Sequence, residues 1–524
     1  MIHKHIAYYR AHFKGDFSAS LVVFLIALPL CLGIALASGA PLFSGLITGL
    51  VGGLIVSFLS GSQLCVSGPA AGLTVIVFSI IEKLGSFQGL LVAVILAGII
   101  QLALGYLRAG IIGAFFPSAV IEGMLAAIGL ILIIKQTPHA TGYHASYEGD
   151  ESYMQETATS SFHELVESIS HNISHGSVVI SGVALLILIV WNLPFFKKYT
   201  FFRLVPAALI AVIWGIAYNQ YTTHFAPEWA VSAQHLVNLP TIKSPSELFN
   251  YFVFPDFSYL TKADTYTSAI TIAIIASLET LLSLEATDKL DPLKRIAPTN
   301  RELKAQGVGN IVSGLLGGLP MTAVIVRSAA NINAGGRTQL SCFMHGLWLL
   351  LSILFIAEFL NTIPLACLSA ILLHTGYKLA NPLVFKHFYK KGASQFLPFI
   401  ITISAILATD LLEGMAIGMA FGIFFVIKGN YHAAITLSKK GSHYLLSFNK
   451  DVSFLNKAVL RKFILSIEEN SFVTIDTTRA KFIDHDIMET IEDFLATTPD
   501  DNIRVEFIEI GGYQRFSGIG EKHT

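Results

Sequence analysis

Charged residues and cysteine are both scarce in this chain, and each scarcity excludes a class of protein. Only 13% of the 524 residues are charged and 53% are apolar, a balance that argues against a single water-soluble globule. Basic and acidic residues number 34 and 35, so the chain lacks the bulk positive charge of a nucleic-acid binder. The four cysteines lie in apolar segments without a CxxC pair, which indicates neither a disulfide framework nor a zinc site.

Apolar runs recur along most of the chain. The polar, basic residues 1–16 precede an apolar run that has no A-x-A cleavage site, so we expect a first membrane span that is retained. Runs of about 15 to 22 apolar residues predict seven spans in each half. The predicted spans cover residues 17–38, 42–60, 68–82, 88–107, 112–134, 177–196 and 201–218, then 265–285, 306–318, 321–334, 339–360, 363–378, 395–409 and 413–429. The prediction is an all-α polytopic membrane domain of fourteen transmembrane segments over 17–429.

Loop charges predict how this domain lies in the membrane. Fourteen crossings from a cytoplasmic N-terminus place the basic loops on the cytoplasmic side, as the positive-inside rule requires. The loop over residues 144–175 would lie outside, and it holds six acidic residues and no Lys or Arg. From about residue 436 charged residues become frequent and strand-like runs alternate with helical patterns. We therefore expect a small cytoplasmic α/β domain over 436–524.

The third and tenth predicted spans are short, and both open with glycine and proline. Residues 67–72 read SGPAAG and residues 317–322 read GGLPMT, about 250 residues apart. Matched interruptions of this kind indicate an inverted repeat, here 17–222 and 262–429, with a binding site near the midplane. A half-helix that begins there presents free N–H groups to an anion, and the small Ala70, Ala71 and Gly72 permit close approach. The alternative is that Gly-Pro marks packing kinks in two unrelated helices.

Two ionisable residues inside predicted spans sharpen this hypothesis, because buried charges in a membrane are costly and usually functional. Arg327 lies in the tenth span, where it either adds positive charge to the anion site or ties a neighbouring helix through a carboxylate. Glu279 lies deep in the eighth span, with Ser283 one turn further on. Glu279 either carries a proton or binds a cation such as Na⁺ together with Ser283. A purely structural pairing with Arg327 is the alternative.

Several of these motifs together resemble those of the SulP family of inorganic-anion permeases, which includes sulfate and bicarbonate transporters. The similarity spans nearly the whole chain and rests on Asp16-Phe17 through Ala27-Leu28-Pro29, Ser67-Gly68-Pro69, the run from Pro320 to Asn331 with Thr322, Arg327, Ser328 and Ala329, and Gly335-Gly336-x-Thr338. It implies a core domain and a gate domain in a seven-plus-seven repeat, commonly a homodimer. It also implies a prokaryotic inner-membrane location and a C-terminal STAS domain, whose strand and loop resemble residues 473–476 and 481–484.

The resemblance places the anion between the third and tenth half-helices, next to Ala70, Ala71, Gly72, Val324, Ile325, Val326 and Arg327. The chain departs from the family pattern at Leu30, where a Gln is frequent, and at Val324 and Val326, where serines are frequent. The predicted site is therefore drier, and recognition depends more on backbone N–H groups and Arg327.

The sequence as a whole predicts a secondary active transporter for sulfate or bicarbonate, coupled to Na⁺ or H⁺ through Glu279 and working by an elevator-type alternating-access mechanism. No cofactor is expected beyond the coupling ion, and no enzyme motif is present. A passive anion channel or exchanger and a nucleobase permease of the same architecture are the alternatives within transport. An anion sensor that signals through the C-terminal domain is the alternative outside it.

Overall fold

The structure is a computed structural model that describes residues 2–111, 117–142, 174–191, 193, 205–240, 251–409 and 411–508. Nearly all of the acidic loop predicted over 144–175 lies outside these residues. The chain divides into two compact units, one formed by Met1–His387 with Phe399–Ile417 and the other by Phe388–Pro398 with Gly418–Thr524. Each unit is described by itself below.

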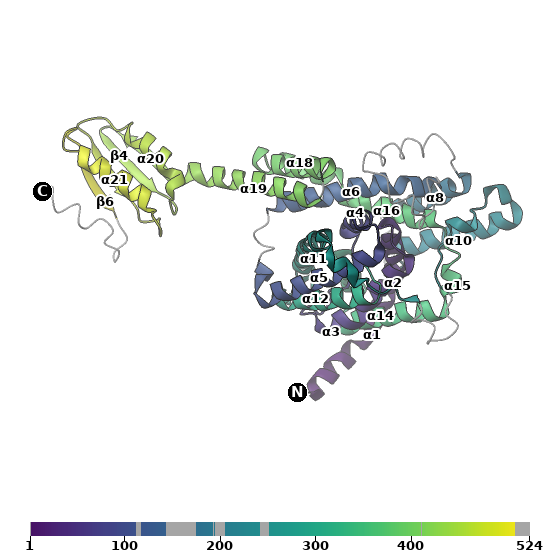
Figure 1. The fold of residues 1–524 in the computed structure, drawn as a ribbon. Coiled ribbons are helices and arrows are strands. Elements are labelled where there is room, and N and C mark those ends of the chain that lie inside the picture. Colours follow the sequence, from purple (N-terminus) through teal and green to yellow (C-terminus); the bar gives the residue numbers. More distant parts are fainter. Residues whose placement is uncertain are drawn as a thin grey trace. The chain divides into compact units, whose positions relative to one another are not determined.

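A helix overlaps each of the fourteen predicted runs. In the first half these are α1 (Ile2–Ala37), α2 (Leu42–Val51) with the π-helical turn η1 (Gly52–Val56) and α3 (Ser57–Leu59), α4 (Thr74–Leu84), α5 (Phe87–Tyr106), α6 (Ser118–Thr141), α8 (His175–Trp191) and α10 (Ala207–Phe225). In the second half they are α11 (Ala263–Leu290), α12 (Thr299–Leu315), α13 (Ile325–Asn333), α14 (Gln339–Phe355), α16 (Leu365–Leu379), α18 (Ala393–Ala408) and α19 (Leu411–Ala433). The short α15 (Ala357–Leu360) and α17 (Pro382–Lys390) flank α16 (Figure 1).

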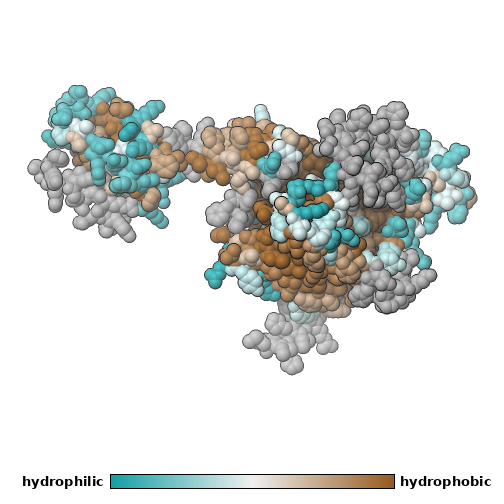
Figure 2. Space-filling view, in the orientation of Figure 1, coloured by the Kyte–Doolittle hydropathy of each residue, from teal (hydrophilic) through white to brown (hydrophobic). Residues whose placement is uncertain are grey.

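The helical membrane-domain class predicted from the sequence is confirmed by these elements. Among the described residues, five helices are long and apolar enough to cross a membrane by length and composition, and four shorter apolar helices accompany them. Figure 2 shows apolar side chains gathered over the visible face of α5, α11 and α12, as expected of a surface that meets lipid. The count of fourteen crossings stays a prediction.

Paired glycines permit close contacts between helices of the larger unit. A Cβ built on Gly98 of α5 would lie 2.6 Å from the carbonyl oxygen of Gly307 on α12, and one on Gly129 of α6 would lie 2.6 Å from that of Gly376 on α16. In lipid, where apolar side chains gain little by meeting each other, such small residues let two backbones approach and pack. These contacts join a helix of the first half to one of the second half in both cases.

A two-stranded antiparallel sheet lies inside the helical unit, which the all-helical prediction did not include. Strand β1 (Ser67–Pro69) pairs with β2 (Met321–Ala323), with Ser67 opposite Ala323 and Pro69 opposite Met321. The Gly-Pro residues of the third span are therefore extended, and the helices begin after the strands. Because Gly and Pro are poor helix residues and buried backbone must be hydrogen-bonded, pairing the two interrupted segments satisfies both.

The smaller unit carries an α/β domain of the kind predicted. Its sheet has the order β3 (Ile435–Lys440), β4 (His443–Phe448), β5 (Phe472–Asp476), β6 (Arg504–Ile508); β3 and β4 are antiparallel and the other neighbours are parallel. Tyr444, Leu446 and Phe448 alternate along β4 toward a core that α20 (Lys457–Ile464) and α21 (His485–Thr497) complete. This architecture fits the predicted STAS domain.

Candidate functional site

The strand pair brings the two predicted halves of the anion site together. Directly after β1, the 3₁₀ turn η2 (Ala71–Leu73) leads into α4, and directly after β2, Val324 caps α13. The Val324 amide donates to the carbonyl of Val66 over 2.9 Å, which extends the pairing by one residue. Each helix therefore starts at the C-terminal end of its strand, and because the strands are antiparallel the two starts lie at opposite ends of the pair. The first N–H groups of a helix have no partner within it.

The predicted lining residues differ in exposure. Ala70 and Gly72 are buried, whereas Ala71, Val324 and Ile325 are half-buried. Val326 is 53% exposed, because successive residues of a helix turn by about 100° and the next residue, Arg327, points inward.

Arg327 crosses from α13 to the opposite strand. Its side chain is fully buried, and Nη2 donates to the carbonyl of Pro69 over 3.4 Å. Nη1 lies so close to Gly68 that a Cβ on that glycine would stand 2.4 Å from it. Among the described residues, Nε and Nη1 have no hydrogen-bond partner and no carboxylate pairs with the guanidinium. The positive charge of Arg327 is therefore not neutralised by Glu279 or by any other described acid.

Glu279 approaches the site from α11. A Cβ built on Gly72 would lie 2.9 Å from both carboxylate oxygens of Glu279, so only a glycine leaves room for this carboxylate at the start of the third half-helix. Oε2 is buried without a hydrogen-bond partner among the described residues. The neighbouring Thr280 accepts a hydrogen bond of 3.3 Å from the amide of Ala323 in β2. Helix α11 thus contacts both halves of the site. Ser283 is buried one turn away, and no described hydrogen bond joins it to Glu279.

Helix α12 holds both strands, which we did not predict. Gln306 donates from Nε2 to Ser67 Oγ of β1 over 2.7 Å. Asn310 contacts β2 with both atoms of its amide, since Oδ1 accepts from the amide of Met321 at 2.7 Å and Nδ2 donates to the carbonyl of the same residue at 3.2 Å. Ser313 Oγ donates to the carbonyl of Leu319 at 2.7 Å. The signal was present in the sequence, because polar residues at 306, 310 and 313 repeat with helical spacing along one face of an otherwise apolar span.

Two further helices complete the support of the second strand. Thr48 Oγ1 of α2 accepts from the amide of Leu319 at 2.6 Å. Gln101 Oε1 of α5 accepts from Asn310 Nδ2 at 2.7 Å. Since buried polar groups in a membrane domain cost free energy unless they are paired, these contacts define the strand position closely.

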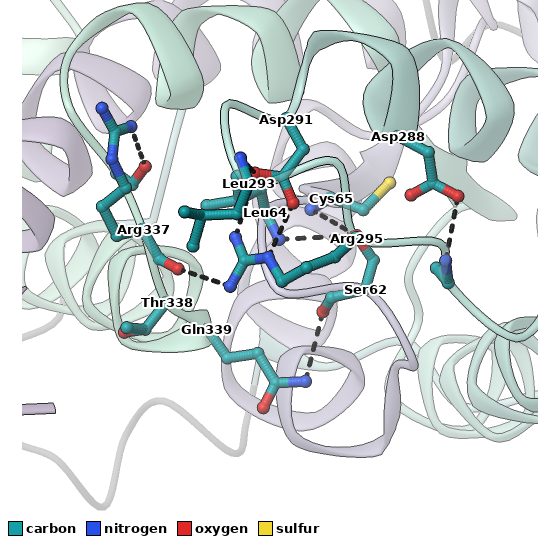
Figure 3. A network of polar contacts seen from close by, with 12 residues as sticks. Ser62, Leu64, Cys65, Asp288, Asp291, Leu293, Arg295, Arg337, Thr338 and Gln339 are labelled. Carbon is teal, nitrogen blue, oxygen red and sulfur yellow. Dashed lines mark hydrogen bonds and ion pairs between the residues drawn. The ribbon is translucent and has the colours of Figure 1, made fainter. Parts of the chain in front are cut away.

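A second polar network links the segments that lead into and out of the site (Figure 3). Gln339 at the start of α14 donates to the carbonyl of Ser62, just before β1. Arg295 pairs with Asp291 at 2.6 Å and donates to the carbonyl of Arg337 at 3.0 Å. Burial alone would raise the pKa of Asp291, but the hydrogen bonds from Arg295 and the backbone outweigh it and lower that pKa below its ordinary value.

Some motif residues in this part of the chain have a structural role. The buried carboxylate of Asp16 accepts from the amides of Arg337 and Thr338, at 2.7 and 3.1 Å, and from Thr338 Oγ1 at 2.5 Å. It therefore stabilises the first turn of α14 from α1. Gly335, with φ of +100°, ends α13 in a conformation that other residues rarely adopt.

Comparisons with known proteins show similarity to sulfate and bicarbonate transporters. The Putative sulfate transporter YvdB of Bacillus subtilis is 26% identical over 432 residues, 82% of this chain and 75% of that protein. The Bicarbonate transporter BicA of Picosynechococcus is 27% identical over 70% of this chain and 61% of its own length. The solved transmembrane domain of a cyanobacterial BicA, 25% identical, superposes with a TM-score of 0.62 over 78% of this chain and 97% of that one. The overall structure of SLC26A9, 16% identical, gives 0.78 over 98% and 87%, which shows the fold.

The sequence model of the sulfate permease family matches residues 13–402. This match covers the whole strand pair, the helices that support it and both ionisable residues of the candidate site. The chain therefore belongs to the sulfate permease family, whose members are anion transporters and not enzymes.

Proposed function

We propose that this protein is a secondary active transporter that carries sulfate or bicarbonate and couples its movement to Na⁺ or H⁺ through Glu279. The observation that carries the proposal is the contact of the Glu279 carboxylate with Gly72, at the first turn of the helix that follows β1. This acid at the start of one half-helix, and Arg327, which no described acid neutralises, on the other give the site both a cation-binding group and an anion-binding one.

The anion is recognised by backbone N–H groups and by the field of Arg327. Both helix starts offer free N–H groups and the positive end of a helix dipole. Arg327 adds a full positive charge inside the protein, where the dielectric is lower than in water. The half-buried Val324 and Ile325 supply no hydroxyl groups. Recognition by shape and charge of this kind suits a small oxyanion better than a nucleobase.

Coupling to a cation is needed because of the membrane potential. Moving one negative charge inward against an inside-negative potential costs about 2.3 kcal/mol per 100 mV. A proton on Glu279, or Na⁺ held by that carboxylate, balances the charge of bicarbonate and halves the net charge that moves with sulfate. Oε2 of Glu279, buried and without a hydrogen-bond partner in the part of the chain that the structure describes, fits either ion. For Na⁺, the hydroxyl of Ser283 would supply a second oxygen ligand.

Movement of the site as one body is the mechanism that we propose for alternating access. The pairing of β1 with β2, the contacts of α12 with both strands, and the contacts of α11 with β2 and with Gly72 join the two halves of the site. These elements would carry the anion past the remaining helices in an elevator-type step. We further propose that the protein works as a homodimer in a prokaryotic inner membrane, with the N-terminus and the STAS domain in the cytoplasm.

The test is uptake of labelled sulfate and labelled bicarbonate into proteoliposomes, each with and without an inward Na⁺ gradient and an inward proton gradient. We expect one anion to accumulate under one gradient. Equal flux with or without a gradient would favour the passive channel or exchanger. If neither anion moved under any gradient, the proposed substrate class would be wrong, and nucleobases would be tested next.

We expect Gly72→Ala to reduce the initial rate of uptake by about 10-fold or more. The new methyl group would stand 2.9 Å from both oxygens of Glu279, so the carboxylate must shift, and displacement of a functional group by about 1 Å strongly slows its step. Folding should persist, because the atoms that give way are the end of a flexible side chain. Initial rates in proteoliposomes and thermal unfolding in detergent measure the two effects.

Gly182→Ala in α8 is the matched control for this variant. Nothing lies within 4 Å of a Cβ at that position, so uptake and unfolding should both match wild type. Unchanged uptake in Gly72→Ala would show that the contact between Gly72 and Glu279 does not matter for transport.

A further inference from the structure

Glu302, at the start of α12, is a buried acid outside the candidate site. Its side chain is fully buried. Oε2 accepts from Ser60 Oγ at 2.5 Å and from the amide of Gly61 at 3.3 Å, and Oε1 accepts from Gln306 Nε2 at 3.0 Å. Among the described residues, no Lys, Arg or His forms an ion pair with Glu302. A carboxyl group is costly to bury with neutral donors alone, so its presence needs a reason beyond packing.

The contacts of Gln306 supply that reason. The same Nε2 that donates to Glu302 also donates to Ser67 Oγ in β1, at 2.7 Å, while Oε1 has no partner among the described residues. A glutamine amide has two faces, one that donates and one that accepts. An ionised carboxylate accepts only, so Glu302 holds the amide with its donor face toward both Glu302 and Ser67.

The two strands are not held equally. On β2, Asn310 contacts Met321 with two hydrogen bonds and Thr280 accepts from the amide of Ala323, and Thr48 and Ser313 contact Leu319, two residues before the strand. On β1, side chains contribute the bond from Gln306 to Ser67 and the long bond from Arg327 to Pro69, and Ser328 Oγ accepts from the amide of Val66, directly before the strand, at 3.0 Å. Loss of the Gln306 contact therefore removes the shorter of the two side-chain bonds to β1 itself.

We propose that Glu302 is a positioning residue for anion binding, which acts through Gln306 on Ser67 and so fixes β1 and the helix start at Ala70, Ala71 and Gly72. Its effect on transport rests on the proposed function, but its effect on the strand does not. Glu302 does not touch the anion in this scheme. It defines how the backbone N–H groups that follow β1 are presented.

The first measurement is the kinetics of uptake. In Glu302→Gln, the new amide can donate as well as accept, so residue 302 no longer fixes which face of the Gln306 amide meets Ser67. We expect the KM for the anion to rise about 10-fold while the maximal rate changes by less than about 2-fold, and Ser67→Ala to act in the same direction. Because Glu302 and Ser67 act in series through Gln306, the double variant should raise the KM no more than the more severe of the two single variants does. A KM increase in the double variant equal to the product of the two single increases would overturn the proposal.

The second measurement does not depend on transport. Amide hydrogen exchange of the purified protein, without substrate, should speed up about 10-fold or more over residues 67–73 in Glu302→Gln and stay unchanged elsewhere. Unchanged exchange over this segment would refute the positioning role. If exchange is faster in Glu302→Gln but the wild-type protein transports no anion, the positioning role would be supported and the proposed function refuted. If Glu302→Gln does not fold, Gln306→Met, which keeps the volume and removes the amide, should show the same local exchange.

Ser181→Ala is the control for the loss of a buried hydrogen bond as such. Ser181 Oγ of α8 donates to the carbonyl of Ala140 in α6 at 2.8 Å, away from both strands. This variant should unfold at a lower temperature and leave both the KM and the exchange of residues 67–73 unchanged. If it changed them as Glu302→Gln does, the effect would be general destabilisation and the proposal would fail.

Discussion

Replacing Glu279 by Gln is expected to lower the initial rate of anion uptake under a Na⁺ or proton gradient by about 100-fold or more, so that the anion no longer accumulates. The amide keeps the size of the side chain and its place against Gly72, but it can neither bind a proton at neutral pH nor supply a negative charge to Na⁺. Exchange of labelled for unlabelled anion, which needs no net charge movement, should be affected less. Uptake and exchange in the same proteoliposomes measure the two processes.

Glu285→Gln is the matched control on the same helix. Glu285 is exposed and pairs with Lys289 at 2.5 Å, and an exposed pair contributes little, so uptake should match wild type. Ser283→Ala separates the two coupling ions. It should weaken the dependence on Na⁺ if Na⁺ is carried and leave a proton-driven uptake unchanged. Gradient-driven uptake that survived in Glu279→Gln would show that the coupling group lies elsewhere.

The interrupted spans show what the sequence could and could not predict. The matched segments rich in glycine and proline indicated where the two halves of the candidate site lie, because these residues together interrupt a helix that the apolar run would otherwise continue. The pairing of Ser67 with Ala323 was not predictable in the same way. Three-residue strands have no period to detect, and what makes them strands is the tertiary demand that buried N–H and C=O groups find partners.

The side chains around the site also differ in how far they could be predicted from the sequence. Arg327 and Glu279 were identified because a charge within an apolar span stands out in the sequence. Their partners were not, since the approach of Glu279 to Gly72 and of Arg327 to Pro69 joins residues about 200 to 260 positions apart. Polar residues of α12 were missed for a different reason: Gln306 and Asn310 are uncharged and common, so their helical spacing carries meaning only once the strands beside them are known.

Arg327→Met should weaken binding of divalent anions much more than binding of monovalent ones. Methionine fills much of the buried volume of the side chain without its charge. Taking about 8 Å between guanidinium and anion and an effective dielectric of about 20, the lost attraction is about 2 kcal/mol for one negative charge and about 4 kcal/mol for two. The KM for bicarbonate should therefore rise about 30-fold and that for sulfate about 1,000-fold. Where only one anion is carried, inhibition of its uptake by the other measures the second affinity.

A comparison with two other arginine variants separates charge from hydrogen bonding. Arg327→Lys keeps the charge and loses the planar fork that reaches Pro69, so its losses should be smaller and nearly equal for the two anions. Arg301→Met is the matched control, because exposed Arg301 also donates to a backbone carbonyl, that of Leu59 at 2.9 Å, and it should leave both KM values within about 2-fold of wild type. If Arg327→Met reduced the affinity for both anions equally, Arg327 would act by holding β1 and not by its charge. The selectivity of the site for anion valence would then have to come from the helix starts alone.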